Sequence, residues 1–308
     1  MIQRNDTPGR AEGLRRALPY IRLYKGKTFV VKVGGDGCVP GDGLGRVLEQ
    51  VGVLAELGIR VVLVHGGGPQ TTELSRKLGI EPTIVDGRRV TCDRTLDVAV
   101  MTLCGSVNSA VLAACRGAGI RAAGVSGLDA SLVTAARRAP VPRFAESGTS
   151  LVDYGHVGDI EAVDPSVLRL LLDAGIVPVV SPISCDREGA VLNVNGDTVA
   201  SRIAIALCAE KLIFLTGAPG ILEDRADPQS LVSYTDLDGL RDLTSRGAIA
   251  AGMLPKARAA REAIEGGVPR VHVISRSAAD ALLVEVFTNE GCGTLVVRDA
   301  SEIAAVVA

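Results

Sequence analysis

Two lysines of this chain lie where an unpartnered ammonium group would be disfavoured. Lys32 is inside the apolar stretch "KTFVVKVGG", where strand alternation would not leave a lysine buried without a reason. Lys256 follows "AGMLP" in the first turn of an expected helix, where the helix dipole disfavours a cation. Each lysine could simply reach water, Lys32 from an edge strand and Lys256 from a surface helix. Each would also suit a site that neutralises a bound anion.

Glycines follow the expected strands at two places. Gly34 and Gly35 come directly after "FVVKV", and the run Gly66, Gly67 and Gly68 comes after "VVLVH". Glycine lets backbone N–H groups approach a phosphate, and a following helix adds a favourable dipole. Neither stretch is a Walker A loop or a dinucleotide GxGxxG in its usual position. A tight turn would explain one or two of these glycines, whereas three in a row favour anion binding.

Polar residues open the expected helix after "AVLNV". Asn193, Asn195 and Asp197 lie in "NVNGDTVAS", although a helix N-cap would need only one of them. The two lysines, the two glycine turns and Asp197 together predict a phosphoryl-transfer site between two anions. The lysines would neutralise the repulsion, the glycine N–H groups would hold phosphoryl oxygens, and the acid would orient the lysines. A carboxylate acceptor is already deprotonated at pH 7, so no general base is expected.

Alternating strands and helices must position these residues. Short apolar runs separated by helices predict a three-layer αβα sandwich on a mostly parallel central sheet, with ligands at the carboxyl ends of the strands. The expected strands are 27–33, 59–64, 120–125, 176–183, 190–194, 211–217, 270–274 and 293–297. The expected helices are 10–24, 44–57, 69–78, 94–115, 164–175, 195–208, 236–246, 254–265 and 279–287. Apolar and polar residues alternate in 131–141 and 150–163, which indicates a hairpin.

A change in the residue pattern near residue 180 predicts two lobes on one continuous sheet. The expected parts are an N-terminal helical extension at 1–25, an N-terminal lobe at 26–180 and a C-terminal lobe at 181–308. The extension is not needed to complete a strand–helix unit. It is expected to be a packing helix or an arm that joins another subunit.

Composition limits the classes of function. The chain has 308 residues, of which 47% are hydrophobic, and a formal net charge of −2, so no nucleic-acid partner is expected. Its seven cysteines form no CxxC pair, which indicates reduced thiols. The N-terminus lacks a signal-type apolar stretch, and no run of about 20 apolar residues is apparent. These features predict a soluble, cytoplasmic protein with no membrane partner.

The order of the motifs resembles the amino acid kinase family over nearly the whole chain, from "ALPYIRLYKGKTFVVKVGG" to "EVFTNEGCGTLVV". The most specific stretches are "LVHGGGPQ", "GRRVT", "NVNGDTVA", "PGIL", "AGMLPK" and "FTNEGCGT". The resemblance is strongest to members that act on N-acetyl-L-glutamate. It implies transfer of the γ-phosphoryl group of ATP to the side-chain carboxylate of N-acetyl-L-glutamate, giving an acyl phosphate in arginine synthesis. The N-terminal lobe would bind this acceptor and the C-terminal lobe would bind ATP.

The resemblance also implies residue roles and a metal. Lys32 and Lys256 would be the transition-state lysines, and Asp197 would organise them. Arg89 of "GRRVT" would clamp the α-carboxylate of the substrate, and Asn193 would bind its acylamino end. The expected phosphoryl-binding residues are Gly34, Gly35, Gly67 and Gly68, and Gly67 also touches the substrate. The expected nucleotide-binding residues are Thr216, Gly220 and Lys256. Mg²⁺ would be carried by the nucleotide, so no metal site made of protein ligands alone is expected.

The N-terminal extension is similar to that of arginine-inhibited hexameric members. The resemblance therefore implies a homo-oligomer, either a dimer or a hexamer, with arginine as an inhibitor. The residues that match the inhibitor site are His272, Glu285 and Gly291.

The chain departs from the family pattern at several positions. Gly217 of "LTGAPG" stands where an acidic residue is usual. Asp36 of "KVGGDG" stands where a neutral residue is usual, close to the expected phosphates. Ser275 and Arg276 replace an Asp-Gly pair near the supposed arginine site. The expected catalytic set is intact.

Two other functions are weighed against this one. The first is a kinase for a related carboxylate, such as a carrier-linked 2-aminoadipate in lysine synthesis, but "GRRVT" favours the acetylglutamate type. The second is a non-catalytic sensor of arginine or nucleotide with the same fold. A sensor has no need of transition-state lysines, so Lys32, Asp197 and Lys256 argue against it.

Overall fold

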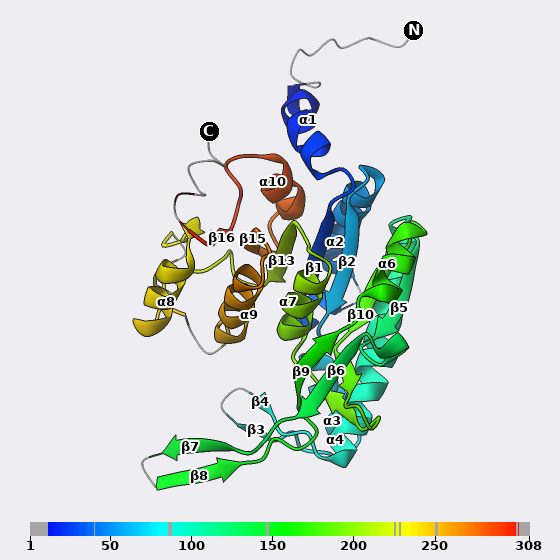
Figure 1. Cartoon of the computed structure of the whole chain (residues 1–308), viewed down its shortest axis with the longest axis vertical. Helices are drawn as coiled ribbons and strands as arrows, with labels where there is room; N and C mark the ends of the chain where they lie inside the picture. Colours follow the sequence, from blue (N-terminus) through cyan, green and yellow to red (C-terminus); the bar gives the residue numbers. More distant parts are fainter. Residues whose placement is uncertain are drawn as a thin grey trace.

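An eight-stranded sheet forms the centre of the molecule in the computed structural model (Figure 1). The structure describes residues 12–39, 41–85, 88–145, 148–224, 226–227, 229–249, 252–299 and 301. In spatial order the strands are β14 (Tyr234–Thr235), β16 (Thr294–Val296), β15 (Arg270–Ser275), β13 (Lys211–Thr216), β1 (Thr28–Val33), β2 (Arg60–His65), β10 (Val177–Ser181) and β5 (Ala122–Ser126). Strands β15 and β16 are antiparallel, and the other neighbouring pairs are parallel. The prediction of a mostly parallel sheet is confirmed.

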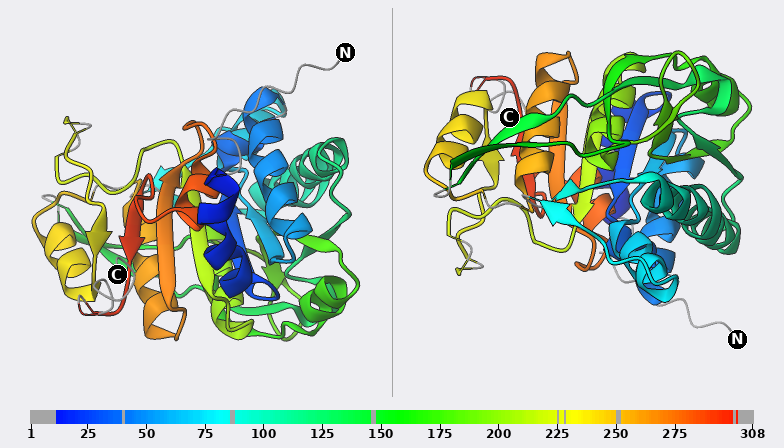
Figure 2. Two further views of the ribbon diagram at one scale, coloured as in Figure 1. Left: turned by 90° about the horizontal axis from the view of Figure 1, so that it is seen from above. Right: turned by 90° about the horizontal axis from the view of Figure 1, so that it is seen from below.

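Helices cover both faces of this sheet (Figure 2), which confirms the predicted three-layer sandwich. Side chains alternate along β1, so Val30 points to one apolar cluster, while Phe29 and Val31 point to the other. The face of Val30 is covered by α6 (Ser166–Asp173), α7 (Gly196–Ala206), α8 (Leu237–Ser245) and α9 (Leu254–Glu265). The opposite face is covered by α2 (Asp42–Glu56), α5 (Asn108–Gly117) and α10 (Ala281–Phe287).

A second sheet and two short hairpins lie at the lower end of the molecule in Figure 1. The second sheet has the order β12 (Val191–Asn193), β11 (Ile183–Cys185), β6 (Val133–Arg137) and β9 (Gly158–Val163). Strands β6 and β9 are antiparallel, as the alternation in 131–141 and 150–163 predicted. The hairpins are β3 (Ile84–Val85) with β4 (Arg88–Arg89), and β7 (Val141–Ala145) with β8 (Gly148–Val152). The sequence did not predict either as a separate unit.

The N-terminal helix α1 (Glu12–Tyr24) packs against α10. It was predicted over 10–24, and residues 10 and 11 lie outside the described part of the chain. Tyr24 is buried at its end, whereas Leu14 and Leu23 are 67% and 53% exposed. This helix therefore presents apolar side chains to the surroundings of this single chain.

A long helix runs through α4 (Asp93–Val100), a π-helical segment (Met101–Val107) and α5, close to the predicted 94–115. The π-helical segment was not predicted. It places Leu103 over Gly67, where an added Cβ would lie 2.5 Å from Leu103 Cδ2. By length and composition this helix could cross a membrane, which corrects the expectation that no such segment exists. Its buried residues Val107, Val111 and Cys115 pack into the core beside the sheet.

The remaining helices are shorter. They are α3 (Gly68–Lys77) and two 3₁₀ turns, Gly35–Cys38 and Asp129–Ser131. All seven cysteines are free, in agreement with the expected reduced thiols.

The buried centre of the sheet can be tested by one substitution. Phe29 is fully buried (0% exposed) between β1 and the helices of the α2 face. Phe29→Ala should lower the free energy of unfolding by about 3–5 kcal/mol, because it leaves a cavity. Leu170→Ala, at a 70% exposed position of α6, should change it by less than about 0.5 kcal/mol. Urea unfolding followed by circular dichroism measures both, and equal losses would contradict the central position of β1.

Candidate active site

The two glycine turns meet at the carboxyl ends of β1 and β2. The parallel register pairs Val33 with His65, so the turns that follow lie side by side. Gly66 N donates to Val33 O at 2.9 Å. A Cβ added at Gly35 would lie 2.7 Å from Gly67 N, so only glycine permits this approach. An added Cβ at Gly68 would meet nothing within 4 Å, which leaves space for a ligand beside α3.

Polar side chains fix these turns. Gln70 Nε2 donates to Gly35 O at 2.5 Å. His65 Nδ1 donates to Gly66 O at 3.0 Å, and its Nε2 accepts from Asn108 Nδ2 at 3.1 Å. Burial lowers the pKa of His65 to about 4, so the imidazole is neutral and braces the turn.

One carboxylate holds both lysines. Lys32 Nζ lies 2.6 Å from Asp197 Oδ1, and Lys256 Nζ lies 3.3 Å from Asp197 Oδ2. Lys32 and Asp197 are 6% and 4% exposed. Burial acts to raise the pKa of Asp197, but the two ammonium groups outweigh it and hold that pKa below its ordinary value. The three side chains form a cluster with one net positive charge.

The local sequence places each member of the cluster. Lys32 lies two residues beyond Val30 and therefore on the same face of β1, towards α7 and α9. The Asn195 side chain accepts from Asp197 N at 2.8 Å and from Thr198 N at 3.2 Å, and so caps α7 with Asp197 in its first turn. Pro255 is the second residue of α9, where proline is tolerated, and Lys256 follows it in the first turn of that helix.

Two cavities flank this cluster. The Lys32 cavity, of about 340 Å³, includes Lys32, Gly35 and Gly67 in its wall. The Lys256 cavity, of about 280 Å³, includes Gly34, Thr216 and Lys256 in its wall. Because Asp197 binds both lysines and Gly34 precedes Gly35, the Lys–Asp–Lys cluster and the first glycine turn contribute to the walls of both cavities.

Arg89 and Asn193 line the Lys32 cavity. Arg89 Nη2 donates to Gly68 O at 3.1 Å and to Thr72 Oγ1 at 2.5 Å, which anchors one edge of the guanidinium on α3. Arg89 Nη1 is buried, and it has no hydrogen-bond partner in the described part of the chain. A buried guanidinium nitrogen without a partner is unfavourable, so an anion that reached it would be stabilised. Gly87, which opens the motif "GRRVT", lies outside the described residues.

The residues expected to bind the nucleotide do not all lie together. Thr216 lines the Lys256 cavity, and its Oγ1 donates to Ala218 O at 2.8 Å. Gly220 is not among the described residues that line this cavity. An added Cβ there would lie 2.6 Å from Thr294 Oγ1, so Gly220 serves close packing against β16.

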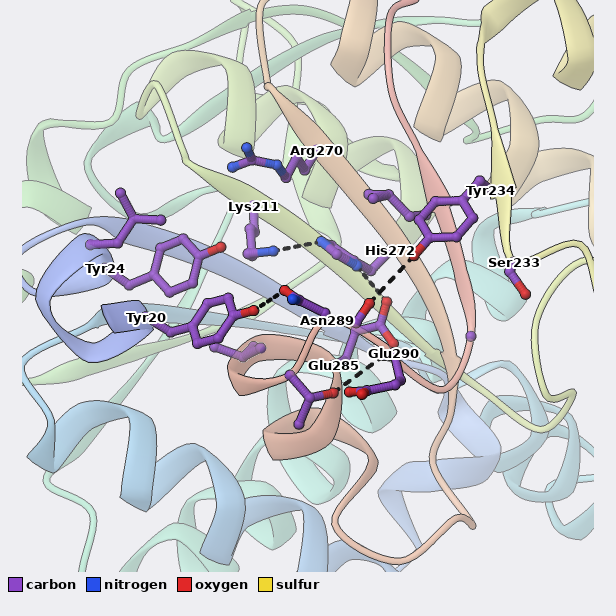
Figure 3. Close-up of a pocket in the computed structure, with 16 residues that line it drawn as sticks. Tyr20, Tyr24, Lys211, Ser233, Tyr234, Arg270, His272, Glu285, Asn289 and Glu290 are labelled. Carbon is purple, nitrogen blue, oxygen red and sulfur yellow. Dashed lines mark hydrogen bonds and ion pairs between the residues drawn. The ribbon is translucent and has the colours of Figure 1, made fainter. Parts of the chain in front are cut away.

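The residues His272, Glu285 and Gly291 lie together in a separate pocket of about 160 Å³ near the opposite ends of β13 and β15 (Figure 3). His272 Nδ1 donates to Glu285 Oε1 at 2.6 Å, and His272 Nε2 lies 2.9 Å from Lys211 Nζ. Gly291 has φ of 61°, and an added Cβ would lie 3.0 Å from Glu285 Oε2. We call this the His272 pocket. Arg276 does not line it but pairs with Asp36, so its expected position near the supposed arginine site is corrected.

Several residues that line the Lys32 cavity were not predicted as site residues from the sequence. Three further arginines, Arg88, Arg138 and Arg258, also line the Lys32 cavity. Burial lowers the pKa of Arg88, and the charges of Arg138 and Arg258 lower it further. These arginines come from β4, the end of β6 and α9, so only the folded chain brings them together. Together with Arg89 and Lys32 they give the cavity a strongly positive wall.

The chain matches the family model described as "Amino acid kinase family" over residues 27–275. The chain belongs to the amino acid kinase family. The match includes Lys32, both glycine turns, Asp197 and Lys256, so the cluster and its two cavities lie within the part of the chain that defines this family.

Relatives in the amino acid kinase family cover nearly the whole chain. It is 47% identical to acetylglutamate kinase of Myxococcus xanthus, over 95% of this chain and 96% of that protein. It is 43% identical to acetylglutamate kinase of Symbiobacterium thermophilum, over 94% of this chain and 98% of that protein. Among solved structures it resembles N-acetylglutamate synthase of Neisseria gonorrhoeae complexed with coenzyme A and N-acetylglutamate, with TM-score 0.80 and 29% identity. That comparison covers 94% of this chain and 64% of the synthase chain.

The Lys–Asp–Lys cluster predicts a large loss of stability when its acid is removed. Asp197→Ala leaves the buried ammonium of Lys32 uncompensated, so the free energy of unfolding should fall by about 3–5 kcal/mol. Asp173→Ala is the matched control. Asp173 pairs with Arg60 at 2.5 Å but is 66% exposed, so its loss should cost about 0–1 kcal/mol. Urea unfolding of both variants measures the difference, and similar losses would show that Asp197 does not hold the lysines.

Proposed function

We propose that this chain transfers the γ-phosphoryl group of ATP to the side-chain carboxylate of N-acetyl-L-glutamate, producing an acyl phosphate in arginine biosynthesis. The observation that carries this proposal is the Lys–Asp–Lys cluster between two cavities. Near-full-length relatives named acetylglutamate kinase support the same activity. The Lys256 cavity would take the nucleotide, and the Lys32 cavity would take the acceptor. The lobes at 181–308 and 26–180 would have these two roles.

The geometry supports a transfer that depends on charge and position. The acceptor carboxylate and the γ-phosphate are both anions, and Lys32 and Lys256 reach them from opposite sides of Asp197. The N–H groups of Gly34, Gly35, Gly67 and Gly68 would hold the phosphoryl oxygens as negative charge develops on them. Asp197 stays ionised and keeps the two ammonium groups in place. It has no proton to remove, because the acceptor is already a carboxylate.

The Lys32 cavity supports an acceptor with a free α-carboxylate. Arg89 is held by α3 on one edge and offers Nη1 to a carboxylate on the other. Asn193 Nδ2 donates to Thr91 Oγ1 at 3.4 Å, which leaves the side-chain oxygen Oδ1 of Asn193 for the acylamino N–H. Nucleotide-bound Mg²⁺ would neutralise phosphate charge when present. Asp197 is already paired with two lysines, so the phosphate oxygens would supply most of the metal's ligands.

Lys256 provides the sharpest test of this function. Lys256→Ala should lower kcat by at least about 100-fold and change KM for N-acetyl-L-glutamate by less than about threefold, because its charge acts in the transition state. Lys77→Ala removes a 68% exposed lysine of α3 and should leave both constants unchanged. A coupled ADP-release assay measures these values with N-acetyl-L-glutamate, L-glutamate and N-acetyl-L-2-aminoadipate.

The same assay separates the alternatives. Preference for the aminoadipate compound would favour a kinase of the lysine-synthesis type. Absence of ADP release with every acceptor, together with binding of nucleotide, would favour a sensor.

We also propose that the His272 pocket binds arginine as an inhibitor. Glu285 would pair with the ligand's cationic groups. Burial acts to raise the pKa of Glu285, but hydrogen bonds from His272 and the Cys292 backbone N–H, together with nearby positive charge, outweigh it and hold that pKa well below the usual range. Figure 3 shows Lys211, His272 and Glu285 in a row along the pocket, with Tyr20 and Tyr24 of α1 beside them. Lys211 begins β13, and Thr216 at the other end of that strand lines the Lys256 cavity. Strand β13 thus connects the two regions.

Arginine inhibition should depend on pH through Lys211. Burial lowers the pKa of Lys211 to about 7, so raising the pH through 7 removes a positive charge beside Glu285. A cationic ligand should then bind more tightly. The inhibitory concentration of arginine should fall by about fivefold from pH 6 to pH 8, as expected if the ligand lowers the pKa of Lys211 by one unit. The groups that contact or electrostatically influence Lys211 are His272 and Arg270 from β15, Tyr24 from α1, Glu285 from α10, and Glu210.

Activity measured with and without arginine at each pH gives this dependence. Lys211→Met should make the inhibition independent of pH in the same range. Unchanged rates of the unsubstituted enzyme up to millimolar arginine would reject the inhibitor site.

Membership of the amino acid kinase family also supports proposals about the oligomeric state and the cellular location of this chain. We infer a homo-oligomer, a dimer or a hexamer, and the exposed Leu14, Leu18 and Leu23 of α1 are apolar side chains that another subunit would cover. We infer a cytoplasmic enzyme, in keeping with a soluble biosynthetic role.

A further inference from the structure

An ion pair joins two distant parts of the chain at the wall of the Lys256 cavity. Arg276, directly after β15, places Nη1 2.7 Å from Oδ2 of Asp36, which lies in the turn after β1. Asp36 and Gly217 both line the cavity. An added Cβ at Gly217 would lie 3.3 Å from Arg276 Nη1 and 3.7 Å from Asp36 Oδ2. The guanidinium therefore lies directly behind this part of the wall.

Two glycines and one backbone hydrogen bond fix the position of Arg276. An added Cβ at Gly37 would lie 2.9 Å from Arg276 Cδ, so a side chain there would displace the arginine. A side chain at Gly217 would crowd the guanidinium itself. Arg276 N donates to Thr216 O at 2.9 Å, which aligns the residue with the end of β13. The two glycines thus leave room for the Arg276 side chain, and the backbone hydrogen bond fixes where it starts.

The two charges of the pair differ in exposure, and of the two only Asp36 lines the cavity. The Asp36 side chain is 56% exposed, and its carboxylate lies in a wall next to the Gly34 turn, where it would repel a polyphosphate. Arg276 compensates this charge and is 22% exposed. Nη1 is the one guanidinium nitrogen of Arg276 with a hydrogen-bond partner among the described residues. The other guanidinium nitrogens have no such partner, but Arg276 is not among the described residues that line the cavity, so an anion in the cavity reaches them only past Asp36 and Gly217.

We propose that Arg276, held in place by Asp36, positions the polyphosphate of the nucleotide in the Lys256 cavity. The proposal rests on the nucleotide binding proposed above for this cavity. A guanidinium can bind two phosphate oxygens at once while it keeps Asp36 as a partner, which a lysine cannot do with the same geometry. Arg276 differs in role from Lys256, because it acts on the bound nucleotide and not on the group in transfer.

Calorimetric titration with ADP tests the proposal without any catalytic step. The variants are Arg276→Gln, Asp36→Asn and the double variant, with thermal unfolding as a check of folding. Arg276→Lys is included because it keeps the charge and removes the planar fork. Arg60→Gln is the matched control, since Arg60 forms an ion pair with Asp173 at the start of β2, at the opposite ends of the strands from the glycine turns.

Arg276→Gln should weaken ADP binding by about 10- to 100-fold, because charged hydrogen bonds are lost and Asp36 is left unpaired beside the phosphates. Arg276→Lys should give a smaller loss. The double variant should bind ADP at least about threefold more tightly than Arg276→Gln, because the unpaired carboxylate is gone. AMP, with its shorter phosphate chain, should lose less affinity than ADP. Arg60→Gln should bind both like the unsubstituted chain.

Two results would overturn the proposal. One is an ADP affinity of Arg276→Gln within twofold of the unsubstituted chain. The other is a double variant that binds no better than Arg276→Gln, since the pair would then be structural only. An unsubstituted chain that does not bind ADP would overturn both this inference and the proposed function. ADP binding that depends on Arg276, without phosphorylation of N-acetyl-L-glutamate, would remove the acceptor assignment alone.

Discussion

The arrangement of the site depends on a buried carboxylate that binds two cations. Asp197 is 4% exposed, and it is stable as an anion only because Lys32 and Lys256 lie at its two oxygens. The three charges come from β1, α7 and α9, so those elements must pack in one relative position. The cluster keeps one positive charge that no described side chain neutralises. An anion bound beside it is therefore favoured, and a phosphoryl group between two cavities meets that need.

The sheet explains why two cavities lie beside this cluster. Strand β1 is in the middle of the eight strands, with β2 on one side and β13 on the other. The chain first builds the side of β2, β5 and β10, and later the side of β13, β15 and β16. Crevices form at the carboxyl ends of the strands where the order reverses. One glycine turn lines both cavities there, through Gly34 on one side and Gly35 on the other.

Strong periodicity made most of the fold predictable from the sequence. The strand expected at 27–33 is Thr28–Val33, and the helix expected at 254–265 is Leu254–Glu265. The π-helical segment Met101–Val107 was not predicted, because its apolar pattern does not differ from that of an α-helix. It bears on the site because Leu103 packs over Gly67, a contact between distant parts of the chain. The short β7–β8 hairpin was likewise read as part of longer alternating segments.

The site residues also divide into those that a short stretch of sequence marks and those that only the folded chain brings together. Lys32, Asp197 and the glycine turns are marked locally, because a buried lysine, a surplus of polar residues at a cap and clustered glycines each break a short-range rule. Arg276 and Asp36 are 240 positions apart, and each alone is an ordinary charged residue. Asp36 alone would be unfavourable beside phosphates, but Arg276 pairs with it. Gly217 lacks the acidic side chain that is usual in the family, and a side chain at this position would crowd the Arg276 guanidinium. The three residues are one charge arrangement, so their effects cannot be added one residue at a time.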